Sequence, residues 1–213
     1  MATAVSDAVI WCDFGGVISG GLGRAFDEVA EAAGVPWREI AVAAVTVAAD
    51  VGLAGFQPLE LGTMPQRDWG ERVADVLGAD DRARTVLRNF DLHYYRTRTV
   101  DHELLEGLQL FRNRGLMLGM LTNSVLEWEP HRAVLLAGTL AFDHYLRSHE
   151  VGIAKPDPAI YELADTLLGS TDSRRFLIDD LDVNCVAAEA HGWSAIRHRD
   201  ARTTLAQLEV RLA

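Results

Sequence analysis

Four short apolar runs of this sequence each lead into a polar residue that could do chemistry. Asp13 follows VIWC, Thr122 ends LMLGMLT, Lys155 lies in SHEVGIAKPDP, and Asp179 and Asp180 follow FLI. Singly, each has an ordinary structural explanation as a helix or turn cap, a strand residue or a solvated charge. In an open parallel sheet, however, ligands bind beyond the carboxyl ends of the strands. If the runs are parallel strands, these side chains meet at one edge of the sheet.

Side chains of these types can together transfer a phosphoryl group. The carboxylate of Asp13 can attack phosphorus and carry the group as an aspartyl phosphate. Mg²⁺ takes oxygen ligands, which suits Asp13 and the acidic pair that ends the fourth run. The hydroxyl of Thr122, the neighbouring Asn123 and the ammonium of Lys155 can hold the non-bridging oxygens as charge spreads over them.

The elements that must position these residues follow from the hydrophobic pattern. Short apolar runs alternate with amphipathic stretches, which predicts an α/β fold with a doubly wound parallel sheet. Strands are expected at 9–13, 116–122, 145–148, 176–179 and 194–198. Helices are expected at 101–114, 157–168, 184–191 and 203–212.

The stretch from residue 20 to residue 95 breaks this alternation. It carries Ala- and Val-rich helical periods and no convincing strand. We therefore predict a small helical cap domain at 20–95, inserted into a core domain made of 1–19 and 96–213. Its apolar segment IAVAAVTVAADVGLAGF could form the core of the cap or a dimer contact, so a monomer and a homodimer both remain open.

Composition restricts the partners and the compartment. The formal net charge of −11 and the pI near 5.0 oppose binding to nucleic acid or to an anionic membrane surface. No stretch approaches the roughly 18 consecutive apolar residues of a membrane span. Cys12 and Cys185 are too few for a disulfide scaffold. We expect a cytoplasmic protein whose partner is a small molecule.

Taken in order, the motifs resemble the haloacid dehalogenase (HAD) superfamily of hydrolases, most of which are Mg²⁺-dependent phosphatases. DFGGV resembles the first motif, LTNS the second, GIAKPDPAIY the third and FLIDDLDVNCVAAEAHGW the fourth. The insertion falls where members with a small helical cap carry it, and PLELGTMPQRDWGERV is similar to a recurring cap segment. The resemblance covers nearly the whole chain and implies a Rossmann-like core acting on a phosphorylated small molecule.

The resemblance also implies a set of metal ligands for Mg²⁺. Asp13 and the backbone carbonyl of Gly15 would be two of them. Asp180 matches the main acidic ligand of the fourth motif, and Asp179 would help it directly or from the outer sphere. Asn184 occupies a place where relatives often have a second acid.

The residues that would act on the phosphoryl group come from the first three motifs. The resemblance implies that Asp13 is the nucleophile and that Thr122 and Lys155 hold the phosphate. Asn123, beside Thr122, and Gly16, in the loop after the nucleophile, are expected to contact the substrate.

Gly15 departs from the family pattern. Most phosphatases of the superfamily have a second aspartate there, which protonates the leaving alcohol and later activates water; such a group contributes about 10²- to 10⁴-fold. Its loss implies a slower reaction, a good leaving group such as an acyl or anomeric phosphate, or an acid from elsewhere. Side chains in the plausible neighbourhood are Asp182, Glu150, Arg24, Asp27 and Glu28.

Gly15 also leaves a dehalogenase activity possible, because superfamily members that displace halide from carbon lack this aspartate too. Those enzymes have no Mg²⁺ and tend to replace the paired acids. Asp179 and Asp180 would repel each other without a cation, which favours a metal site. A phosphatase is therefore preferred, with a non-phosphate hydrolase or a catalytically weak phospho-ligand-binding protein as the alternatives.

Overall fold

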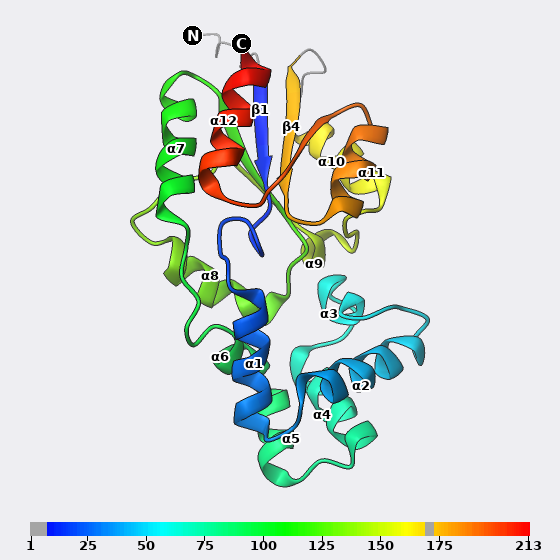
Figure 1. Cartoon of the computed structure of the whole chain (residues 1–213). Coiled ribbons are helices and arrows are strands. Elements are labelled where there is room, and N and C mark those ends of the chain that lie inside the picture. The colour runs from blue at the N-terminus through cyan, green and yellow to red at the C-terminus, as the bar shows by residue number, and fades with distance from the viewer. Residues whose placement is uncertain (1–7, 169–172) are drawn as a thin grey trace.

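Five parallel strands form one sheet in the order β3-β2-β1-β4-β5 (Figure 1). The computed structural model describes residues 8–168 and 173–213. The strands are β1 (Ala8–Cys12), β2 (Met117–Thr122), β3 (His144–Arg147), β4 (Arg174–Asp179) and β5 (Ser194–Arg197). With the first strand in the middle and the order reversing around it, the sheet is doubly wound, as predicted.

Helices cover both faces of this sheet. On one side lie α7 (His102–Asn113) and α12 (Ala201–Leu212), and on the other α10 (Pro158–Leu168) and α11 (Asp182–Ala190) (Figure 1). The alternation along β1 explains the two layers, because successive side chains point to opposite faces. Ile10 and Cys12 join the apolar cluster of the first side, while Val9 and Trp11 join that of the second.

The remaining helices cover the carboxyl end of the sheet and extend away from it. Six lie between β1 and α7, namely α1 (Leu22–Ala33), α2 (Trp37–Ala49), α3 (Gln57–Glu60), α4 (Gln66–Leu77), α5 (Asp81–Arg88) and α6 (Phe90–Tyr94). The short 3-10 helix η1 (Leu126–Trp128), α8 (Glu129–Leu136) and α9 (Ser148–Val151) follow β2 and β3. Figure 1 shows the six helices grouped at the end of the molecule opposite the chain termini. The predicted boundaries of a cap domain at 20–95 stay a prediction.

Partly or fully buried polar contacts join α4 and α6, two of the six helices between β1 and α7 that we call the cap, to η1 and α8. The backbone N–H of Gln66 donates to Glu127 at 2.9 Å, and the indole of Trp128 donates to the Gln66 side chain at 2.7 Å. His131 and Asp91 share a further hydrogen bond of 2.8 Å. The cap therefore rests on η1 and α8 through specific bonds as well as apolar packing.

The ends of the predicted strands and of the predicted core helices lie within two residues of those in the structure. The third strand lies one residue earlier than predicted, because Ser148 opens α9 and accepts a hydrogen bond from the Ser124 N–H. The segment between β2 and β3 also contains η1 and α8, which were not predicted. Pro130 lies in the first turn of α8, where a missing N–H costs least.

Among the described residues, no single helix is long and apolar enough to cross a membrane. Only α1 and α2 taken together, with a bend of 94° between them, pass such a test by length and composition.

Candidate active site

Asp13 directly follows β1, whose carboxyl end points toward the cap helices in Figure 1. Its N–H donates to the Ile178 carbonyl at 2.9 Å, so β1 stays paired with β4 up to the carboxylate. The chain then turns tightly, with the Gly16 N–H donating to Ser19 O and the Ser19 N–H donating to Phe14 O. The strand and the turn together hold Asp13 at the edge where the other predicted residues arrive.

Lys155, the only lysine of the chain, connects three strand ends. Its Nζ lies 3.0 Å from Asp13 Oδ1 and 2.6 Å from Asp179 Oδ2, and it donates to the Leu121 carbonyl at 2.9 Å. Burial alone lowers the pKa of Lys155, but the charges of Asp13 and Asp179 raise it above the ordinary value. The ammonium therefore stays charged and fixes both carboxylates.

Asn123 holds the backbone of Lys155. Its side-chain amide donates to the Lys155 carbonyl at 2.9 Å and accepts from the Lys155 N–H at 2.8 Å. Thr122, buried at the end of β2, donates its hydroxyl to the Asn123 carbonyl at 3.2 Å. The second and third motifs are thus bonded to each other, and the structure gives Asn123 a positioning contact that the sequence did not predict.

Asp179 is fully buried and bonded on both carboxylate oxygens. Oδ2 binds Lys155, while Oδ1 accepts from the Leu181 N–H and from the Asn184 side chain, each at 2.9 Å. Asn184 therefore orients Asp179.

Asp180 lies over the loop that follows the nucleophile. Gly16 has φ +84°, and a Cβ there would stand 2.3 Å from Asp180 Oδ2. The absence of a side chain at Gly16 is what makes room for this carboxylate. A cavity of about 760 Å³ beside the two residues, lined also by parts of 20–24, 97–101 and 198–200, gives solvent a path to Asp180.

These three aspartates form a group that could hold a cation. Asp13, Asp179 and Asp180 each offer a carboxylate oxygen within 4.8 Å of the others. Burial raises the pKa of Asp13, with Lys155 opposing the rise, and burial also raises the pKa of Asp180 to about 6, with the charges of the other two aspartates adding to it. Three carboxylates around one ammonium leave an excess of negative charge in a buried place, and an oxygen-binding divalent cation fits that need.

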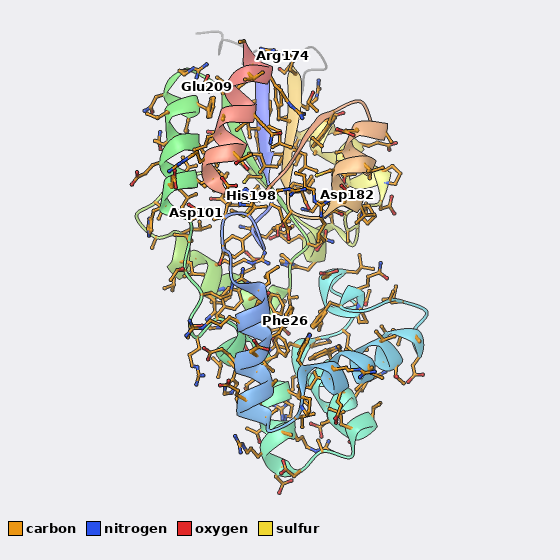
Figure 2. The ribbon with its side chains drawn as sticks, in the orientation of Figure 1. Phe26, Asp101, Arg174, Asp182, His198 and Glu209 are labelled. Atoms are coloured by element: carbon orange, nitrogen blue, oxygen red, sulfur yellow. The ribbon has the colours of Figure 1, made fainter. Side chains whose placement is uncertain are left out.

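The space next to Gly15, where a side chain would stand, is almost free of other atoms. Within the described part of the chain, and apart from the two adjoining residues, the one atom within 4 Å of a Cβ placed there is Leu22 Cδ2, at 3.9 Å. None of the acids suggested by the sequence lies next to it. Figure 2 shows Asp182 at the level of the strand ends, where it pairs with Arg197 at 3.2 Å. The other suggested residues are ion-paired or exposed: Glu150 with Arg147, Glu28 with Arg96 and Arg24, and the exposed Asp27.

The sequence analysis did not single out two residues, Arg132 and Glu60, whose pKa values are raised in part by the charge of Asp13. Arg132 of α8 is buried, lies over the Phe14 ring at 4.8 Å and binds Glu129 at 3.1 Å. Glu60 is the last residue of α3, and burial together with the negative charge of Asp13 raises its pKa to about 6. The segment containing Glu60 was noted only for its resemblance to a cap, and no local pattern indicates that α3 packs against α9.

Known proteins resemble this chain along most of its length. The family of haloacid dehalogenase-like hydrolases matches residues 8–192. The phosphoserine phosphatase of Thermus thermophilus is 30% identical over 119 residues, which are 56% of this chain and 47% of that protein. The chain spans less than half the length of the curated relatives it matches.

Solved structures share the fold at low sequence identity. A HAD family enzyme from Bacteroides thetaiotaomicron, in complex with magnesium and inorganic phosphate, has a TM-score of 0.66 at 18% identity, over 90% of this chain and 94% of that one. The 2-haloacid dehalogenase of Pseudomonas syringae pv. tomato has a TM-score of 0.67 at 18% identity, over 97% and 99%. Since the family match runs through all four strand ends described above, the chain belongs to the haloacid dehalogenase-like hydrolases.

Proposed function

We propose that this hydrolase is a Mg²⁺-dependent phosphatase that acts on a small phosphorylated metabolite through an aspartyl phosphate on Asp13. The observation that carries the proposal is the group of three aspartates, two of them paired with Lys155, whose excess negative charge suits a divalent cation. The similarity to a phosphoserine phosphatase supports the same chemistry. We also propose a cytoplasmic location, which agrees with two buried free thiols.

The arrangement assigns a part to each side chain. Lys155 holds Oδ1 of Asp13, which leaves the other oxygen to attack phosphorus. Thr122 and the loop amides after Asp13 would bind the non-bridging oxygens. Asp13, Asp180 and the Gly15 carbonyl would hold Mg²⁺, with Asp179 orienting Lys155. The bound ion would supply positive charge against the developing charge on the phosphoryl oxygens.

The test is phosphate release from a panel of phosphomonoesters and acyl phosphates, with Mg²⁺ and with a chelator. We expect metal-dependent turnover that the Asp13→Asn variant lacks while remaining folded. Asp50→Asn, an exposed change at the end of α2, is the matched control and should behave as wild type. Folded protein without turnover on any phosphate would contradict the proposal.

A haloacid dehalogenase is the second candidate, because Gly15 lacks the usual acid and the fold is shared with a 2-haloacid dehalogenase. Its signature would be chloride release from 2-chloropropionate that does not depend on Mg²⁺. If neither activity is found and phosphate still binds, a phospho-ligand-binding protein becomes the better description.

A further inference from the structure

The phosphatase reaction needs a proton donor that the first motif of this chain does not supply. The leaving alkoxide must gain a proton, and water must lose one when it attacks the aspartyl phosphate. Gly15 has no side chain for either step, and its nearest neighbour is a methyl group of Leu22. An acid that replaces it must come from another element facing Asp13.

Helix α3 of the cap lies against the core at this place. It packs on α9, and Figure 1 shows it on the side of the cap that faces α9. The approach is close, because a Cβ on Gly62 would stand 2.7 Å from the His149 carbonyl. Leu59 is buried, and the N–H of Met64 and the hydroxyl of Thr63 both donate to the Pro58 carbonyl. The short helix is therefore held firmly between cap and core.

Glu60 ends this helix two positions before Gly62, which meets His149. His149 Nδ1 lies 2.7 Å from the hydroxyl of Ser124 in the second motif. This end of α3 therefore lies beside the strand ends that form the site.

Burial raises the pKa of Glu60 to about 6, and the negative charge of Asp13 adds to the rise. The positive charges of Lys155 and Arg132 act in the opposite direction. Within residues 8–168 and 173–213, the Glu60 side chain has no hydrogen bond or ion pair.

Four other acids in or near this region are ion-paired. Each of the four pairs with one or more arginines, so it cannot exchange a proton without losing a partner. They are Glu28 with Arg96 and Arg24, Glu129 with Arg132 and Arg147, Glu150 with Arg147, and Asp182 with Arg197. Glu60 differs from all of them because it is half-buried and unpaired.

We propose that Glu60, brought over the site by α3, is the general acid and base that replaces the side chain missing at Gly15. This inference rests on the proposed phosphatase function. It assigns a catalytic part to the cap beyond substrate recognition.

The proton changes balance over the two steps. In the first, an Asp13 oxygen bonds to phosphorus, the bond to the leaving oxygen breaks, and that oxygen takes the proton of the Glu60 carboxyl. In the second, Glu60 takes a proton from water as the water oxygen bonds to phosphorus. The bond between phosphorus and Asp13 then breaks, its electron pair returns to the carboxylate, and inorganic phosphate leaves.

The test compares wild type, Glu60→Gln and the control Glu106→Gln, an exposed change on α7. The probes are phenyl phosphate and 4-nitrophenyl phosphate, two substrates of similar shape whose leaving groups differ in their need for a proton. Glu60→Gln should lower kcat on phenyl phosphate by about 10²- to 10⁴-fold. On 4-nitrophenyl phosphate it should release one nitrophenolate per enzyme in a fast burst and then turn over slowly. The slow phase is expected because no general base activates the water that hydrolyses the aspartyl phosphate.

A rescue variant separates catalysis from a purely structural effect. Gly15 has room for a side chain and no positive φ, so Gly15→Asp in the Glu60→Gln background should restore turnover at least tenfold and remove the burst. Equal loss on both substrates, without a burst and without rescue, would overturn the assignment, as would wild-type kinetics for Glu60→Gln. If wild-type turnover depends on Asp13 and Glu60→Gln changes nothing, only the role of Glu60 fails. If wild type releases no phosphate at all, both proposals fail.

Discussion

The core side and the cap side of the site hold their charges in opposite ways. On the core side, Asp179 and Lys155 are buried and every charged atom has a partner, including backbone groups of Leu121 and Leu181. On the cap side, Glu60 is half-buried and has no partner in the described part of the chain.

This difference corresponds to two tasks. A group that must stay in one protonation state and one position gains from a full set of bonds, since each unpaired buried charge costs stability. A group that must give up and regain a proton works better without an ion-pair partner, because such a partner would hold it in one protonation state. The core would therefore fix the positions of the nucleophile and its charged neighbours, and the cap would provide the group that donates and accepts a proton.

The largest expected effect comes from removing the cation at the centre of the core network. Lys155→Met leaves Asp13 and Asp179 buried without their ion pair. Breaking such a pair from one side costs about 3 to 5 kcal/mol in the free energy of unfolding. Urea unfolding at pH 7 measures this cost. Arg197→Met breaks only the exposed pair with Asp182 and should cost about 1 kcal/mol or less. Equal losses in the two variants would contradict the comparison.

A smaller loss is expected when the support of Lys155 is removed instead of its charge. Asn123→Ala deprives the Lys155 N–H and carbonyl of their side-chain partner. Unsatisfied buried groups of this kind cost about 1 to 3 kcal/mol each, so unfolding should become easier by about 2 to 3 kcal/mol. The control is Gln109→Ala, which breaks an exposed amide bond to Asn113 and should change stability by less than about 0.5 kcal/mol. An Asn123→Ala variant as stable as the control would mean that water replaces the amide.

The two neighbouring glycines after Asp13 give the next test, because their surroundings differ. In Gly16→Ala the methyl group meets the Asp180 carboxylate at a backbone φ of +84°, which should cost about 1 to 3 kcal/mol and weaken Mg²⁺ binding. In Gly15→Ala the methyl group meets only Leu22 at 3.9 Å, and stability should stay within about 1 kcal/mol of wild type. Thermal unfolding and Mg²⁺ titration calorimetry check both. A tolerated Gly16→Ala would show that Asp180 can move without loss.

Much of the core side could be predicted from the sequence, because its signals are local. Asp13, Thr122 and Asp179 each follow an apolar run at a strand end, and parallel strands bring their carboxyl ends to one edge. The sequence could not predict what Asn123 bonds to, since its partner is the backbone of Lys155, 32 positions away.

The cap side could not be predicted in the same way. The sequence shows the helical periods of the insertion. Nothing in PLEL indicates that α3 packs on α9 or that the charge of Asp13 acts on Glu60. That placement depends on long-range contacts such as Gly62 against His149. The sequence analysis suggested acids close in sequence to the motifs, such as Asp182 and Glu28. In the structure both form ion pairs with arginines.

The smallest effect concerns Glu60 itself and is a gain in stability that depends on pH. Because burial raises the pKa of Glu60 to about 6, against about 4.3 for a free glutamate, the folded protein binds this proton more tightly than the unfolded chain. The fold therefore loses stability as the pH rises from about 4 through 6, because the Glu60 carboxylate becomes charged while buried and under the negative charge of Asp13. Glu60→Gln removes that cost and should be more stable than wild type by about 1 to 2 kcal/mol at pH 7.5. The difference should disappear at pH 4.5, and Glu106→Gln should show none at either pH. Urea unfolding in the presence of a chelator, at both pH values, measures it. A Glu60→Gln variant less stable than wild type at pH 7.5 would mean that the carboxylate has a stabilising partner, and the contrast between the two sides of the site would then be lost.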